Sequence, residues 1–144
     1  MKTKKPLVVD SSIAVKWVHN QDEKYIEQAD KILENVQAEN IYVMMPELSK
    51  YEVGNALLYK QMSLNETLGS LATYHHIPIQ FIAQDEQQAK DAMRIAYENK
   101  ITFYDASFIA LAKDQKADLV TDNPKHQNKY KGKEVRIVPL KNYI

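Results

Sequence analysis

The chain has 144 residues, a length that suits one domain with a sizeable core. Its 19 Lys and Arg balance its 19 Asp and Glu, so the overall charge does not indicate a nucleic-acid binder. The absence of cysteine excludes disulfides, thiolate metal sites and a cysteine nucleophile, and three glycines are too few for a glycine-rich phosphate loop. We expect a single domain over residues 1–144, in which any binding of nucleic acid comes from a local surface.

The first residues are basic, but the apolar run that follows, at residues 6–9, is far too short for a signal peptide or a transmembrane span. A chain without cysteine is compatible with a reducing compartment. We therefore expect a cytoplasmic protein that does not contact a membrane.

Short apolar runs alternate along the chain with longer segments whose apolar residues recur at helical spacing. We expect strands at residues 7–9, 41–45, 77–83, 118–121 and 134–138. We expect one helix over residues 47–62 and others that begin after the cap residues Asp10, Asn20, Ser63, Asp85 and Thr102. The alternation predicts an α/β fold of three layers, in which helices cover both faces of a mostly parallel central sheet of about five strands.

The segment at residues 101–112 is almost entirely small or apolar after Asp105, which is typical of a buried helix. With Thr102 as N-cap, Asp105 falls in the first turn, where the helix dipole favours a negative charge. A carboxylate at the start of a buried helix is costly unless something compensates it. Asp105 therefore either completes a capping box with Thr102 or holds a cation.

Acidic residues gather at one edge of the predicted sheet. Asp10 ends the first strand, Asp122 ends the fourth, Asp105 begins the buried helix, and Glu52 lies on the helix after the second strand, with Asn55 one turn further as a supporting residue. Each acid alone also suits a plainer role, as a cap, a solvent-facing residue or a turn residue. Together they predict a site for Mg²⁺ or Mn²⁺, because such a cation resolves the repulsion between clustered carboxylates and prefers oxygen ligands. An ion held in this way can polarise a phosphoryl oxygen and activate water.

Several short stretches occur in a recognisable order over nearly the whole chain: residues 8–17 (VVDSSIAVKW), 46–48 (PEL), 52–57 (EVGNAL), 104–112 (YDASFIALA) and 119–121 (LVT). They resemble the PIN-domain ribonucleases, most closely the VapC-like toxins of type II toxin–antitoxin systems. The resemblance implies a sheet flanked by helices, an acidic pocket that holds Mg²⁺ or Mn²⁺, and endonucleolytic cleavage of RNA. It also implies a homodimer and a small protein antitoxin.

On this resemblance, Asp10, Glu52 and Asp105 match the three most regular acids of the family, and Ser12 matches a hydroxyl that supports the pocket. The fourth acidic position of the family usually reads Thr-x-Asp. Here Thr121 is followed by Asp122 and then by Asn123, so the place of the acid holds an amide.

Neighbouring side chains of an extended segment point to opposite sides, so only one of Asp122 and Asn123 can face the pocket. Alignment with the family pattern Thr-x-Asp favours Asn123 as the residue that faces the pocket. The negative charge of Asp122 favours Asp122 instead, because a fourth carboxylate would strengthen cation binding. We take Asp122 as the fourth catalytic and metal-binding acid, with Thr121 and Asn123 as supporting residues of the loop, and leave the number of metal ions open.

The sequence thus predicts a metal-dependent endoribonuclease that acts as the toxin of a toxin–antitoxin pair. The alternative is a catalytically silent PIN-like module that binds RNA or a protein partner, which the amide at Asn123 leaves open. A haloacid-dehalogenase-like phosphatase would need a second Asp where this chain has Ser12. A basic stretch at residues 125–136 could bind RNA phosphates or form a solvated loop. Lys16 could likewise approach a phosphate, although we expect it to be simply exposed.

Overall fold

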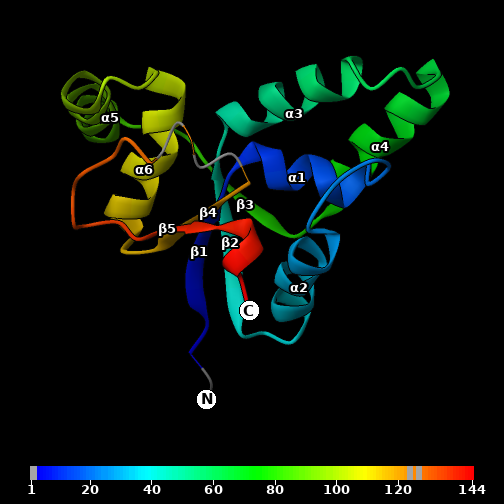
Figure 1. The fold of residues 1–144 in the computed structure, drawn as a ribbon, viewed down its shortest axis with the longest axis horizontal. Helices are drawn as coiled ribbons and strands as arrows, with labels where there is room; N and C mark the ends of the chain where they lie inside the picture. The colour runs from blue at the N-terminus through cyan, green and yellow to red at the C-terminus, as the bar shows by residue number, and fades with distance from the viewer. Residues whose placement is uncertain (1–2, 123–124, 126–127) are drawn as a thin grey trace.

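The computed structural model describes residues 3–122, 125 and 128–144. Five parallel strands form one sheet in the order β3-β2-β1-β4-β5 (Figure 1). The strands are β1 (Lys5–Val9), β2 (Ile41–Pro46), β3 (Ile79–Ile82), β4 (Asp118–Thr121) and β5 (Ile137–Pro139). The expected parallel α/β sheet is confirmed, including the position of each strand to within a few residues.

Helices cover both faces of the sheet (Figure 1). One face carries α5 (Glu86–Asn99) and α6 (Phe103–Gln115), and the other carries α1 (Ser11–Val18), α2 (Ile26–Gln37), α3 (Leu48–Leu58) and α4 (Leu64–His76). A short 3-10 helix, η1 (Leu140–Asn142), follows β5. The helices α3 and α4 extend outward beyond the sheet, so part of their surface lies away from the core (Figure 1).

The helix α6 is the buried helix that the sequence predicts. Every residue from 106 to 112 is buried, because α6 packs against β1, β2 and β4 on one side and against α5 on another. Thr102 is its N-cap and accepts a hydrogen bond from the backbone N–H of Asp105 at 3.0 Å. The predicted position of Asp105 in the first turn is therefore confirmed.

The predicted caps Asp10, Ser63 and Asp85 are also confirmed, and the one at Asn20 is wrong. Ser63 and Asp85 accept hydrogen bonds from backbone N–H groups in the first turns of α4 and α5. The helix expected to begin after Asn20 begins only at Ile26, after Tyr25 in a left-handed conformation with φ 59°. Glu23, which would have completed that capping box, instead forms ion pairs with two lysines.

The order in which the chain adds strands to the sheet reverses at β1, although all the strands are parallel. The chain proceeds from β1 to β2 and β3 on one side, and β4 and β5 lie on the other side. In open α/β sheets, ligands bind beyond the carboxyl ends of the strands at such a reversal. The ends of β1 and β4 are therefore the place where this fold offers a site. In the part of the chain that the structure describes, no helix has the length and apolar character needed to span a membrane.

Candidate active site

Asp10 directly follows β1, at the reversal point, and is held by the neighbouring strand β4 and by the next helix, α1. Its backbone N–H donates to the carbonyl oxygen of Val120 at 3.0 Å, which continues the pairing of β1 with β4. Its Oδ1 accepts from the backbone N–H of Ser12 at 3.1 Å and so caps α1. Its Oδ2 accepts from the hydroxyl of Thr121 at 2.7 Å. Thr121 is fully buried, so this hydrogen bond fixes the orientation of the Asp10 carboxylate.

Glu52 points from α3 toward the same edge. Its Oε1 accepts a hydrogen bond from the hydroxyl of Ser11 at 2.9 Å. Burial raises the pKa of Glu52, the hydrogen bond from Ser11 lowers it, and the negative charges of Asp10 and Asp105 raise it further, so that the net pKa lies above the ordinary value. The structure thus brings three of the predicted acids, from three different elements, into one electrostatic environment.

Two adjacent serine hydroxyls at the start of α1 contact predicted acids, and the supporting role of Ser12 stays a prediction. Ser11, a residue without a predicted role in the site, is the serine that donates to Glu52. The hydroxyl of Ser12 accepts from the backbone N–H of Asp122 at 3.3 Å. Asn55 is exposed one turn beyond Glu52 on α3, and its supporting role stays a prediction.

Asp122, the predicted fourth acid of the site, forms an ion pair with Lys16. Oδ2 of Asp122, directly after β4, lies 3.0 Å from the Nζ atom of Lys16. The expectation that Lys16 is exposed is wrong, since only 3% of its surface is accessible. Asn123 lies outside the described residues. Metal binding by Asp122 or by Asn123 therefore stays a prediction.

The chemistry of the donors suits a hard divalent ion, because Asp10, Glu52 and Asp105 offer only carboxylate oxygens. The carboxylates of Asp10 and Glu52 are directed toward hydroxyl and backbone partners of the protein. Among the residues that the structure describes, no three His, Asp or Glu side chains stand close enough together to hold an ion as they are placed. To hold an ion together, these side chains would have to move closer to one another than the structure places them.

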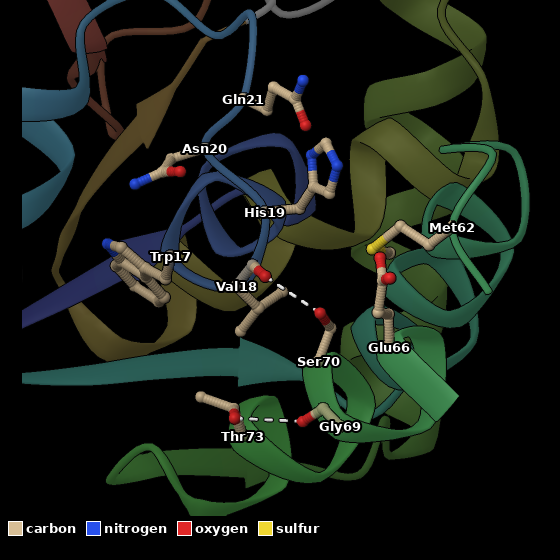
Figure 2. Close-up of a pocket in the computed structure, with 10 residues that line it drawn as sticks. All are labelled: Trp17, Val18, His19, Asn20, Gln21, Met62, Glu66, Gly69, Ser70 and Thr73. Atoms are coloured by element: carbon tan, nitrogen blue, oxygen red, sulfur yellow. Dashed lines mark hydrogen bonds between the residues drawn. The ribbon is translucent and has the colours of Figure 1, made fainter. Parts of the chain in front are cut away.

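One cavity lies at the end of α1, and another adjoins the helices that carry two of the acids. A cavity of about 570 Å³ lies between the end of α1 and α4, and Figure 2 shows Trp17, His19 and Glu66 among its lining residues. Figure 2 also shows the hydroxyl of Ser70 donating to the carbonyl oxygen of Val18, which ties α4 to the end of α1. No predicted site residue lines this cavity. A smaller cavity of about 180 Å³ lies between the first turns of α3 and α6, the helices that carry Glu52 and Asp105.

Part of the basic stretch at residues 125–136 is already used inside the protein. Nε of Arg136 donates to Oδ2 of Asp118 at 3.1 Å, and the backbone N–H of Lys131 donates to Oδ1 of Asn99 at 3.0 Å. Residues 126 and 127 lie outside the described residues. The proposed binding of RNA phosphates by this stretch stays a prediction.

The comparisons with known proteins agree with this picture. The family model of the PIN domain matches residues 7–132. No curated protein sequence matches the chain significantly. Among solved structures, VapBC2 from Rickettsia felis, bound to a DNA fragment from its promoter, aligns with a TM-score of 0.71 and 14% identity, over 93% of this chain and 98% of that chain.

Two further structures share the fold. DNA-bound VapBC from Salmonella typhimurium aligns with a TM-score of 0.69 and 16% identity, over 96% of this chain and 99% of that chain. VapC20 of Mycobacterium tuberculosis, described as a sarcin–ricin loop cleaving toxin, aligns with a TM-score of 0.66 and 14% identity, over 90% and 98% of the two chains.

Proposed function

This chain belongs to the PIN domain family, and from that premise we propose that it is a metal-dependent endoribonuclease, the toxin of a toxin–antitoxin pair. The observation that carries the proposal is geometric: beyond the carboxyl ends of the strands, Asp10 caps α1, and Ser11 of α1 donates to Glu52. The charges of Asp10 and Asp105 both raise the pKa of Glu52 at this edge. Negative charge gathered at this edge is what a divalent cation would compensate.

Asp10, Glu52 and Asp105 are the residues we assign to the ion, Mg²⁺ or Mn²⁺. When bound, the ion supplies charge stabilisation at a phosphoryl oxygen and activates water. The protein supplies orientation, since Thr121 holds the carboxylate of Asp10 and Ser11 holds that of Glu52. Asp105 lies at the N-terminus of α6, so the helix dipole stabilises its charge in the absence of a metal.

The raised pKa of Glu52 has a consequence for the pH dependence of cleavage. A proton on Glu52 competes with the ion, because a metal binds the deprotonated carboxylate. Raising the metal concentration should restore some of the cleavage that is lost in acid. Cleavage should therefore fall as the pH is lowered through the pKa of Glu52, and the midpoint of this fall should move to lower pH at higher Mn²⁺.

A small protein antitoxin is the partner we propose, with cellular RNA in the cytoplasm as the substrate. The structures from Rickettsia and Salmonella are of VapBC assemblies bound to DNA. On this chain, α4 leaves Leu64 and Leu68 with 72% and 53% of their surfaces exposed, and α3 leaves Leu58 with 69% exposed. Exposed apolar side chains on neighbouring helices are typical of a surface that a partner covers. A homodimer is also expected, without a surface assigned to it.

The test is cleavage of RNA by the purified protein with Mg²⁺ or Mn²⁺ and with EDTA. Asp10→Asn, Glu52→Gln and Asp105→Asn should each remove most of the activity. Asp30→Asn, which changes an exposed acid on α2, is the matched control and should keep it.

A contaminating nuclease would survive in all variants purified in the same way, so the Asp105→Asn protein measures the background. Cleavage by the wild type that EDTA does not reduce, after this background is subtracted, would exclude the proposed mechanism. Binding of RNA without cleavage in any metal would favour the silent module.

A further inference from the structure

A buried ammonium group lies beside the candidate site and is fully engaged by the protein. Nζ of Lys16 lies 2.9 Å from Oε2 of Glu23, 2.8 Å from the carbonyl oxygen of Lys24 and 3.0 Å from Oδ2 of Asp122. An ammonium has three N–H donors, so three partners satisfy it completely. The side chain of Lys16 is 2% exposed, so water contributes little to its solvation.

The partners of Lys16 are themselves held in place. Oε1 of Glu23 accepts from Nζ of Lys60 at 2.7 Å, so that Glu23 lies between two lysines. The backbone N–H of Asp122 donates to the hydroxyl of Ser12 at 3.3 Å. Asp122 is thus anchored to α1 at two points, its carboxylate through Lys16 and its amide through Ser12.

The helix α1 therefore delivers two opposite charges to the same edge of the sheet. Its N-cap, Asp10, is one of the two acids whose charges act on Glu52, whereas Lys16 lies further along the helix and pairs with Asp122, the residue that follows β4. A carboxylate that is paired with a buried ammonium has its charge compensated inside the protein. An ion that approached Asp122 would meet the positive charge of Lys16.

We propose that Lys16 is a positioning residue that serves as a built-in cation: it compensates Asp122 and so limits the site to one divalent ion, held by Asp10, Glu52 and Asp105. This inference rests on the proposed metal-dependent function. It assigns Asp122 to the frame of the site rather than to the ion, which departs from the expectation drawn from charge alone. If Asp122 turned to an ion, Lys16 would keep only Glu23 as an ionic partner in a buried position.

The experiment is the stoichiometry of Mn²⁺ binding, measured by the electron paramagnetic resonance signal of free Mn²⁺ and by calorimetry. The wild type should bind one ion per chain, and Asp122→Asn and Lys16→Arg should do the same with unchanged affinity. Lys16→Met frees the Asp122 carboxylate and should bind a second ion. The double variant Lys16→Met/Asp122→Asn should return to one.

Two results would overturn the inference. One is binding of two ions by the wild type with loss of one in Asp122→Asn. The other is a folded Lys16→Met protein, verified by circular dichroism, that still binds one ion. If Lys16→Met does not fold, the comparison of wild type with Asp122→Asn decides: unchanged binding supports the inference, and loss of an ion or of affinity overturns it.

Failure of the proposed function gives a different result. A wild type that binds no Mn²⁺, or whose binding Asp105→Asn does not weaken, would exclude the metal site itself. The readout is metal binding rather than cleavage, so a change that only perturbed the RNA-binding surface would leave it unaltered.

Discussion

Replacing Lys16 with Met should cost the protein a large part of its stability. Removing one partner of a buried ion pair typically lowers the free energy of unfolding by about 3–5 kcal/mol, because the remaining charge is left uncompensated. Met fills a similar volume, so the change removes the charge without a large cavity. The effect therefore reports the ammonium group and its three contacts.

The structure places the expected loss at the lower end of that range. Glu23 keeps its contact with Lys60 at 2.7 Å after the substitution, and the side chains of Glu23 and Asp122 are 20% and 25% exposed, so water can partly solvate them. We expect a loss of about 3 kcal/mol. For a domain of this size, that corresponds to a decrease in melting temperature of roughly 6–12 °C.

The pH dependence has a definite sign. Burial lowers the pKa of Lys16, but its hydrogen bonds and charge interactions with Glu23 and Asp122 outweigh burial and leave the pKa raised. A base with a raised pKa contributes stability that is complete below its unfolded pKa and is lost as the pH rises through the folded pKa. Burial raises the pKa of Glu23, but its two lysine partners leave it lowered, so its contribution is lost as the pH falls through its folded pKa. The difference between wild type and Lys16→Met should therefore be largest near neutral pH.

The assay is urea unfolding followed by circular dichroism, from about pH 3 to about pH 11, a range that spans the ordinary pKa values of Glu and Lys. The matched control is Lys90→Met on α5, which removes an exposed ion pair with Glu86 and should change stability by less than about 0.5 kcal/mol. A loss below about 1 kcal/mol for Lys16→Met, the usual size for a surface pair, would refute the reasoning, and so would a loss that does not vary with pH.

Three further substitutions test the residues around the acids. Thr121→Val removes the hydroxyl that donates to Asp10 at 2.7 Å and should lower the free energy of unfolding by about 1.5–3 kcal/mol, the usual contribution of a hydrogen bond to a charged group. Thr102→Ala removes the N-cap of α6 and should cost about 1 kcal/mol. Glu52→Gln, in metal-free buffer, should raise stability at neutral pH. Burial and two neighbouring charges raise the pKa of Glu52. A carboxyl group with a raised pKa lowers the free energy of unfolding as the pH rises through that pKa, and the neutral amide of Gln avoids this loss. All three are measured by urea unfolding.

A different result would contradict each of these three predictions. Thr121→Val with wild-type stability would mean that the carboxylate does not depend on this hydroxyl. Ser63→Ala, at an exposed cap of α4, is the reference for Thr102→Ala, and no loss at either position would exclude capping as a contribution. A Glu52→Gln protein that is less stable than the wild type at neutral pH, with the same difference in acid, would contradict the raised pKa.

Local features of this fold could be predicted from the sequence. The caps at Ser63, Asp85 and Thr102 join a side-chain oxygen to a backbone N–H three residues away, so everything they require lies within one turn. The burial of α6 follows from its apolar composition on all sides. The position of Asp10 at the edge of the sheet follows from a short apolar strand that ends in an acid.

What the sequence did not reveal depends on contacts between distant segments. The predicted start of α2 is too early because Glu23, an apparent capping residue, pairs with Lys16 and Lys60 from other segments. The hydrogen bond from Ser11 to Glu52 joins residues 41 positions apart, so a pair of adjacent serines could not show which one supports the acid. A signal for Lys16 was present: it follows three consecutive buried apolar residues of α1, where a lysine needs an internal partner.

The contrast between Glu52 and Asp122 explains where a divalent ion should bind. Both are acids at one edge of the sheet, but the nearest charges that act on Glu52 are negative, whereas Asp122 is paired with the ammonium of Lys16. A cation is attracted to Glu52 by the negative charges that surround it and is repelled from Asp122 by the ammonium of Lys16, so it should bind at Glu52 rather than at Asp122. The same reasoning predicts that Asp122→Asn weakens folding, because it leaves Lys16 with one ionic partner, more than it weakens metal binding. Glu52→Gln should do the opposite, and this crossed outcome separates the residue that frames the site from the residue that holds the ion.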